Sequence, residues 1–280
     1  MSDGVVRLAK HRLDFGGGCK VMGILNVTPD SFSDGGRFVG IEQAVSHGVE
    51  MVEQGAEIID VGAESTRPGS ERVSAEEQIR RAIPVIEALA DRVDVPISID
   101  TFSSEVARRA IEAGASIIND ITAMGDAGMI ELLVEHELGV ILMHMQGMPG
   151  TMQDSPSYVD VVREVLDYLV ERAEYAEKAG VGRDKIFIDP GIGFGKTQEH
   201  NLLLLKHVGD FAASGYKVLM GTSRKGFIGK ITGVEKASDR VMGTAATVAL
   251  SAAGGASVVR VHDVGAMVEV VKMANAIANA

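Results

Sequence analysis

The sequence has little cysteine, few aromatic residues and no excess of positive charge. It contains one cysteine, Cys19, no tryptophan and only 4% aromatic residues. A single cysteine cannot form an internal disulfide and fits a reducing compartment, so we expect a cytoplasmic protein. A formal net charge of −12 provides no broad basic surface for DNA or RNA, so we expect no nucleic-acid partner.

Long apolar runs are also missing. None approaches the roughly 18 residues of a membrane-spanning helix, so we expect no insertion into a membrane. Hydrophobic residues still make up 46% of the 280 residues, which is enough to bury a large core. An anionic substrate therefore needs a local cationic cluster that acts against the negative charge of the whole molecule.

Glycine is abundant, with 33 residues, and it marks a recurring pattern. An amphipathic segment ends at a glycine such as Gly55 or Gly114, and four to six β-branched or apolar residues follow. Glycine adopts the left-handed conformation that ends helices, and the apolar run after it is typical of a parallel strand covered on both faces. The pattern predicts eight strands, at residues 20–26, 57–60, 96–100, 116–120, 140–144, 185–189, 217–221 and 257–262.

The segments between these strands predict helices, and their order predicts the fold. The helical segments are 40–54, 74–92, 103–113, 127–137, 157–179, 198–213, 224–253 (broken near Gly233) and 263–279. Eight alternating units predict an α/β protein with one domain over residues 1–280, a (β/α)8 TIM barrel; an open doubly wound sheet is the alternative. Alternating residues over 5–15 predict a short hairpin before the barrel.

Polar residues stand at the end of every predicted strand. A single Asp or Asn in this place is most often a helix cap, but capping alone does not account for all eight strands. In a TIM barrel the chemistry lies at this carboxyl end of the strands. The strand-end residues include Asn26, Asp60, Asp100, Asn119, His144, Asp189, Ser223 and Arg260.

These polar side chains form two chemical groups. Asp100, Asn119 and Asp189 suit a heterocycle with amino and ring N–H groups, because carboxylate and amide oxygens accept hydrogen bonds. A cationic group suits a phosphate or pyrophosphate and consists of Lys225, Arg260 and His262. For Arg260, a salt bridge inside the barrel is the alternative.

Three loops stand out by composition. The loops after the first two strands, residues 28–36 and 64–70, carry both Pro and Gly and predict mobile lids. The run Gly191, Gly193 and Gly195 does not match a dinucleotide-binding motif. We interpret it as backbone brought close to a ligand, with Phe194 as a wall on which a ring stacks.

Several sequence motifs, taken together, resemble those of the dihydropteroate synthase family over about residues 20–275. The resemblance rests on MGILNVTPDSFSDGG at 22–36, IDVGAESTRPG at 59–69, ISIDT at 97–101, IND at 118–120, DPGIGF at 189–194, SRK at 223–225 and RVH at 260–262. It implies the joining of 6-hydroxymethyl-7,8-dihydropterin pyrophosphate to 4-aminobenzoate in folate biosynthesis, with release of pyrophosphate.

The resemblance also implies roles for single residues. The pterin contacts of the family match Asp100, Asn119, Asp189 and Lys225, and its anion contacts match Arg260 and His262. The Mg²⁺ ligand matches Asn26. The surroundings of aminobenzoate match Thr66, Arg67, Pro68, Phe194 and Ser223, and Gly221 is a further substrate contact. Sulfonamides imitate aminobenzoate in this family. A homodimer through residues 243–253 and the final helix is implied as well, although both segments are also suited to face the barrel.

The residues fit a dissociative substitution. We expect Asp100 to stabilise the positive charge that develops on the exocyclic methylene. Mg²⁺ on Asn26, which the resemblance implies, would stabilise the leaving pyrophosphate together with Arg260 and His262. The aromatic amine is neutral and attacks without a strong base, which favours binding of aminobenzoate after the pterin. The alternatives are a pterin-binding methyltetrahydrofolate methyltransferase, a Schiff-base aldolase that uses Lys225, and an inactive pterin-binding barrel.

Overall fold

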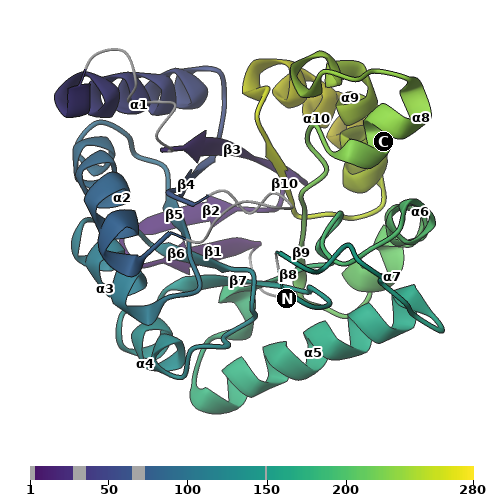
Figure 1. The fold of residues 1–280 in the computed structure, drawn as a ribbon, viewed down its shortest axis with the longest axis horizontal. Coiled ribbons are helices and arrows are strands. Elements are labelled where there is room, and N and C mark those ends of the chain that lie inside the picture. The colour runs from purple at the N-terminus through teal and green to yellow at the C-terminus, as the bar shows by residue number, and fades with distance from the viewer. Residues whose placement is uncertain (1–3, 28–35, 65–72, 149) are drawn as a thin grey trace.

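The computed structural model describes residues 4–27, 36–64, 73–148 and 150–280. Parallel strands form a closed barrel, which confirms the predicted TIM barrel and not the open sheet (Figure 1). The barrel closes where Val258 pairs with Lys20. Its strands are β3 (Lys20–Asn26), β4 (Ile58–Gly62), β5 (Ile97–Asp100), β6 (Ile117–Asp120), β7 (Gly139–Met143), β8 (Ile186–Asp189), β9 (Lys217–Met220) and β10 (Val258–Val261).

Helices surround the barrel, as Figure 1 shows. They are α1 (Gly36–Glu53), α2 (Ala75–Ala90), α3 (Ser104–Glu112), α4 (Gly128–Glu135), α5 (Val161–Ala179), α6 (Gln198–Lys206), α7 (Val208–Ala212), α8 (Gly226–Thr232), α9 (Val241–Ala253) and α10 (Val264–Ala278). Within the described ranges, no helix is both long and apolar enough to cross a membrane.

Local chemistry sets the ends of these helices. Helix α5 begins at Val161 rather than at residue 157, because the Asp160 side chain accepts hydrogen bonds from the first free N–H groups of the helix. Gly233 ends α8 with a left-handed φ of 75°, as the predicted break requires. The helix predicted over 198–213 is divided at His207, whose φ and ψ of −109° and 27° leave the helical region.

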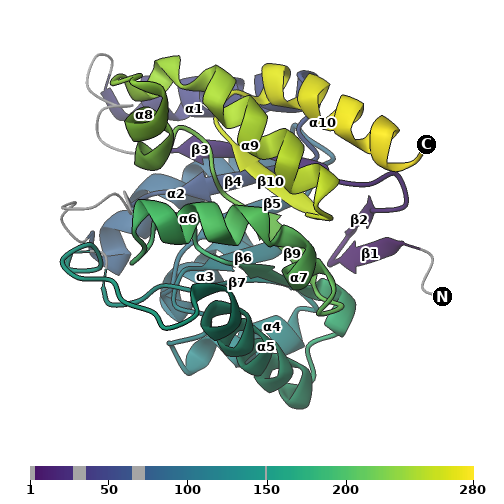
Figure 2. The ribbon, with the colours of Figure 1, turned by 90° about the vertical axis from the view of Figure 1, so that its right-hand side faces the viewer.

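A hairpin closes the amino end of the barrel. Strands β1 (Val5–Leu8) and β2 (His11–Asp14) pair antiparallel, as predicted, and Figure 2 shows them at the side of the barrel opposite α8. Val6, Leu8 and Leu13 pack against a layer of buried side chains from seven of the eight barrel strands, all but β5: Met22, Ile58, Ile117, Ile141, Phe187, Leu219 and Val258. The hairpin therefore seals this end of the barrel with apolar contacts.

The interior becomes polar one step further along the strands. Side chains alternate between the two faces of a strand, so the residue two positions after an inward residue also points inward. Following Ile58, Ile117, Phe187 and Val258, this next inward layer contains Asp60, Asn119, Asp189 and Arg260. Along these strands the inward-facing side chains therefore change from apolar, next to the hairpin, to polar, two residues further on.

Candidate active site

A cavity of about 1430 Å³ lies at the carboxyl end of the barrel. The structure brings ten of the predicted site residues together on its wall: Asn26, Asp100, Asn119, Asp189, Phe194, Gly221, Ser223, Lys225, Arg260 and His262. The remaining three, Thr66, Arg67 and Pro68, lie outside the described residues, as does most of each loop predicted to form a lid.

Arg260 connects the carboxylates on the floor of the cavity. Its Nε donates to Asp60 Oδ2 at 2.6 Å and its Nη2 to Asp100 Oδ2 at 2.9 Å. Asn119 Nδ2 donates to the same Asp60 oxygen at 3.1 Å. The salt bridge considered for Arg260 is therefore present, and Arg260 lines the cavity as well.

Asp60 was not among the predicted site residues. It is wholly buried, and its Oδ1 has no hydrogen-bond partner among the described residues. The signal for it was its position two residues after the inward-facing Ile58, at the end of an apolar run. Its role in this structure is to hold Arg260 and Asn119 in place beneath the cavity.

Burial changes the acidity of two carboxyl groups here. It raises the pKa of Asp100 to about 7, against the opposing effect of the Arg260 charge. Burial also raises the pKa of Asp189, while the N–H of Gly191, 2.8 Å from Asp189 Oδ1, and the charge of Lys225 act in the other direction. Both groups are thus poorly hydrated acceptors that gain from a bound partner rich in N–H groups.

The loop after β8 packs closely against the loop after β7. Gly191 and Gly195 both have positive φ, and a Cβ on either would stand 2.0 Å from the His144 carbonyl oxygen or 2.3 Å from that of Gln146. These two glycines permit close approach to neighbouring backbone, and Gly193 between them lines the cavity, while the predicted approach of this run to a ligand stays a prediction. The Phe194 ring centroid lies 4.2 Å from Lys225 Nζ, a cation–π contact at the cavity wall.

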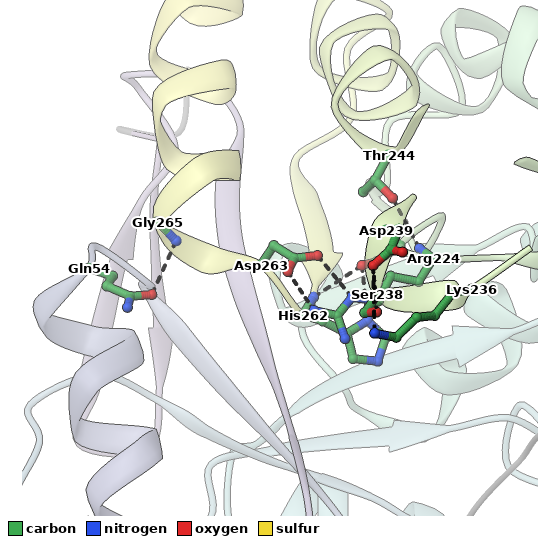
Figure 3. Close-up of polar contacts among 10 residues, drawn as sticks. Gln54, Arg224, Lys236, Ser238, Asp239, Thr244, His262, Asp263 and Gly265 are labelled. Atoms are coloured by element: carbon green, nitrogen blue, oxygen red, sulfur yellow. Dashed lines mark hydrogen bonds and ion pairs between the residues drawn. The ribbon is translucent and has the colours of Figure 1, made fainter. Parts of the chain in front are cut away.

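The loops after β9 and β10 are joined by polar contacts, which Figure 3 shows. The backbone N–H of His262 donates to Ser223 Oγ at 3.1 Å, and His262 Nδ1 lies 2.9 Å from the same oxygen. Arg224, with a φ of 58°, donates from Nε to Asp263 Oδ2 at 3.0 Å. Ser223, Lys225 and His262 are thereby held at one side of the cavity.

A smaller cavity of about 520 Å³ adjoins this side and shares Asn26, Arg224 and His262 with the larger one. No group of three or more His, Cys, Asp or Glu side chains in the described part of the chain is arranged to hold a metal ion. Asn26 nevertheless offers a hard amide oxygen at the point where the cavities meet. A Mg²⁺ ion bound mainly through substrate phosphates and water needs only one or two such protein ligands.

Sequence and structure comparisons agree on one family. Residues 22–262 match the family model described as pterin binding enzyme. A dihydropteroate synthase from Synechocystis sp. is 46% identical over 265 residues, which cover 94% of this chain and 92% of that protein.

Solved structures resemble the whole barrel. The dihydropteroate synthase of Xanthomonas albilineans with 4-aminobenzoic acid has a TM-score of 0.92 at 44% identity, covering 99% of this chain and 98% of that one. The Yersinia pestis dihydropteroate synthase in a sulfonamide drug complex also has a TM-score of 0.92, at 41% identity, and covers 99% and 100% of the two chains.

Proposed function

The chain belongs to the pterin binding enzyme family as a dihydropteroate synthase, and we propose that the mouth of its barrel carries out the family's condensation. In that reaction 6-hydroxymethyl-7,8-dihydropterin pyrophosphate and 4-aminobenzoate give 7,8-dihydropteroate and pyrophosphate. The observation that supports this most is the convergence of Asp100, Asn119, Asp189, Lys225 and Arg260 on one cavity.

The acidic and amide groups suit the pterin ring. Asp189 is a buried acceptor, Asp100 is an acceptor whose side chain is only 11% exposed, and Asn119 offers both an acceptor and donors. We assign Asp100 the task of stabilising positive charge as the C–O bond to pyrophosphate breaks, because its carboxylate is poorly hydrated and fixed by Arg260. We therefore propose a dissociative substitution, in which the C–O bond breaks first and the amine of aminobenzoate then attacks the positively charged methylene.

The basic side of the cavity suits the leaving pyrophosphate. Lys225 and His262 belong to neighbouring loops and line the same cavity as Arg260, which is bonded to Asp60 and Asp100. A guanidinium has five N–H groups, so its two ion pairs do not use all of its donors. We assign Arg260 and His262 to the departing anion and Lys225 to the ring, beside Phe194.

Mg²⁺ fits this site through its substrate rather than through a protein cage. Asn26 would hold the ion, together with oxygens of the pyrophosphate. Bound there, Mg²⁺ would supply positive charge to the leaving group. The work of this chain is to bring Asn26 and His262 to the same edge of the cavity.

For aminobenzoate we propose the region around Phe194 and Ser223. Phe194 presents its ring beside Lys225, next to the pterin-binding carboxylates, and Ser223 lies on the neighbouring loop. The Xanthomonas albilineans protein was solved with 4-aminobenzoic acid and the Yersinia pestis protein in a sulfonamide drug complex, which supports an aminobenzoate site in this chain. The chain is accordingly a sulfonamide target.

We also propose that the protein is a homodimer. Large apolar side chains are exposed on the adjacent helices α9 and α10: Met242, Leu250, Met273 and Ile277. Large exposed apolar side chains on neighbouring helices favour association with a second copy. Light scattering should give twice the 29.5 kDa mass of one chain, and a monomer at micromolar concentration would contradict the proposal.

One assay tests the function. Purified protein is incubated with the pterin pyrophosphate, aminobenzoate and Mg²⁺, and dihydropteroate is measured. The matched control replaces the pyrophosphate ester with free hydroxymethyldihydropterin, which has no comparable leaving group. Product from the ester alone supports the proposal, and absence of product from both substrates contradicts it.

We also propose a cytoplasmic location, which the single buried Cys19 supports and which cell fractionation tests.

A further inference from the structure

Lys196 is a buried lysine at the end of the loop after β8. Only 3% of its surface is exposed. Its Nζ lies 3.0 Å from His144 Nδ1, 3.3 Å from the His144 carbonyl oxygen and 2.9 Å from the Phe194 carbonyl oxygen. An ammonium group has three N–H donors, so each donor has one acceptor. Two of these acceptors belong to the end of β7 and the third to the loop that carries Phe194.

This geometry suits a neutral His144. If the ammonium donates to Nδ1, the imidazole is neutral and carries its proton on Nε2. Burial and the Lys196 charge lower the pKa of His144 to about 3, which agrees with a neutral ring. Burial also lowers the pKa of Lys196, to about 7. The ring of Tyr168 meets the imidazole edge-on, with centroids 5.1 Å apart.

Other side chains bind the same loop, but at other carbonyls. Tyr158 Oη donates to the Gly195 oxygen at 2.9 Å, and Gln153 Nε2 donates to the Gly193 oxygen at 2.5 Å. Lys196 bonds the carbonyl of Phe194 itself and joins it to a neighbouring barrel strand. The orientation of the Phe194 ring against Lys225 therefore depends on the position of Lys196.

We propose that Lys196 is a positioning residue: its three hydrogen bonds, to His144 and to Phe194, hold the Phe194 ring where aminobenzoate stacks. This inference rests on the proposed function, because it uses the assignment of Phe194 to aminobenzoate. Lys196 itself needs no contact with either substrate. Loss of its hydrogen bonds should weaken aminobenzoate binding far more than binding of the pterin.

The test is Lys196→Met, which keeps an unbranched side chain one atom shorter and removes all three donors. We expect the KM for aminobenzoate to rise about tenfold, with kcat changed by less than about threefold, because the ring wall contributes equally to ground-state and transition-state binding. The inhibition constant of a sulfonamide should rise in parallel. The Kd for hydroxymethylpterin, measured by calorimetry, should stay within about threefold.

Controls separate positioning from general damage. Lys178→Met changes an exposed lysine on α5 and should alter none of these constants. Tyr158→Phe removes the bond to Gly195 and keeps the ring, so it should raise the KM for aminobenzoate in the same direction even if Lys196→Met does not fold. An unchanged KM for aminobenzoate in a folded Lys196→Met overturns the inference, whatever Tyr158→Phe shows. If Lys196→Met is insoluble, an unchanged KM for aminobenzoate in Tyr158→Phe overturns it.

Equal losses of pterin and aminobenzoate binding in Lys196→Met would also overturn it, since they indicate a general structural role. The proposed function fails by a different result, namely no dihydropteroate from the unmodified protein. Normal synthesis by the unmodified protein with a normal KM for aminobenzoate in Lys196→Met refutes the role of Lys196 but leaves the proposed function intact.

Discussion

Replacing Arg260 with methionine removes the guanidinium that pairs with Asp60 and Asp100 while keeping a long side chain. The Asp60 side chain is wholly buried and that of Asp100 is 11% exposed, so neither carboxylate gains much water in return. Removing one partner of a buried ion pair costs roughly 3–5 kcal/mol. Because Arg260 is itself 21% exposed, we expect about 3 kcal/mol, at the lower end of that range.

This loss should be visible as a lower melting temperature. An unfolding entropy of roughly 2.1 cal/mol/K per residue, applied to the 280 residues of the chain, converts about 3 kcal/mol into a decrease in Tm of about 5 °C. Urea unfolding gives the free energy directly. The surface variant Arg163→Met, which breaks only an exposed pair with Asp167, should stay within about 0.5 kcal/mol of the unmodified protein.

The loss should also depend on pH. Burial raises the pKa of Asp100, and a carboxyl group with a raised pKa favours the folded state at acid pH but loses that effect as the pH rises through the folded-state value. Without Arg260, which opposes this shift, the effect grows. The variant should therefore be most destabilised at about pH 8 and less so at about pH 5. Equal losses at both pH values, or a loss below about 1 kcal/mol, would refute the reasoning.

Three further predictions concern activity. Asp100→Asn should lower kcat by about 100-fold or more, and Asp167→Asn, at an exposed position, is the control. In the unmodified enzyme, kcat/KM should decrease as the pH falls below about 7, because Asp100 takes up a proton. A value of kcat/KM that stays constant down to about pH 5 would contradict this role of Asp100. His262→Ala should raise the KM for the pterin pyrophosphate about tenfold and leave the Kd for free hydroxymethylpterin within about twofold; equal losses would remove the anion assignment. Chelation of Mg²⁺ should suppress dihydropteroate formation, restored by added Mg²⁺ but not by Na⁺, whereas undiminished rates would exclude Asn26 as a metal ligand of consequence.

The barrel could be predicted because its signals are local. A glycine after each amphipathic segment and a short apolar run after it mark where a helix ends and a buried strand begins. The division at His207 gave no such signal, since neither glycine nor proline stands there and the apolar pattern continues through it. The start of α5 had a signal in Asp160, a strong capping residue with an apolar-periodic segment behind it.

Most residues of the cavity wall could be predicted, but not Asp60 as a member of the site, nor the pairing of the side chains. Counting strand ends identified Asp100, Asn119 and Arg260 as neighbours on one rim. The ion pair of Arg260 with Asp60 joins residues 200 positions apart and exists only because β10 closes the barrel onto β3. The bond from Lys196 to His144 likewise depends on how two loops pack, which no spacing in the sequence encodes.

The central claim is that one cavity holds the pterin ring at its acidic floor and the diphosphate at its basic side. A crystal structure of the protein with the pterin pyrophosphate tests this most directly. We predict the amino and ring N–H groups within hydrogen-bond distance of Asp100, Asn119 and Asp189, and the diphosphate beside His262 and Arg260. A ligand bound in the reverse orientation, or outside this cavity, would contradict the account.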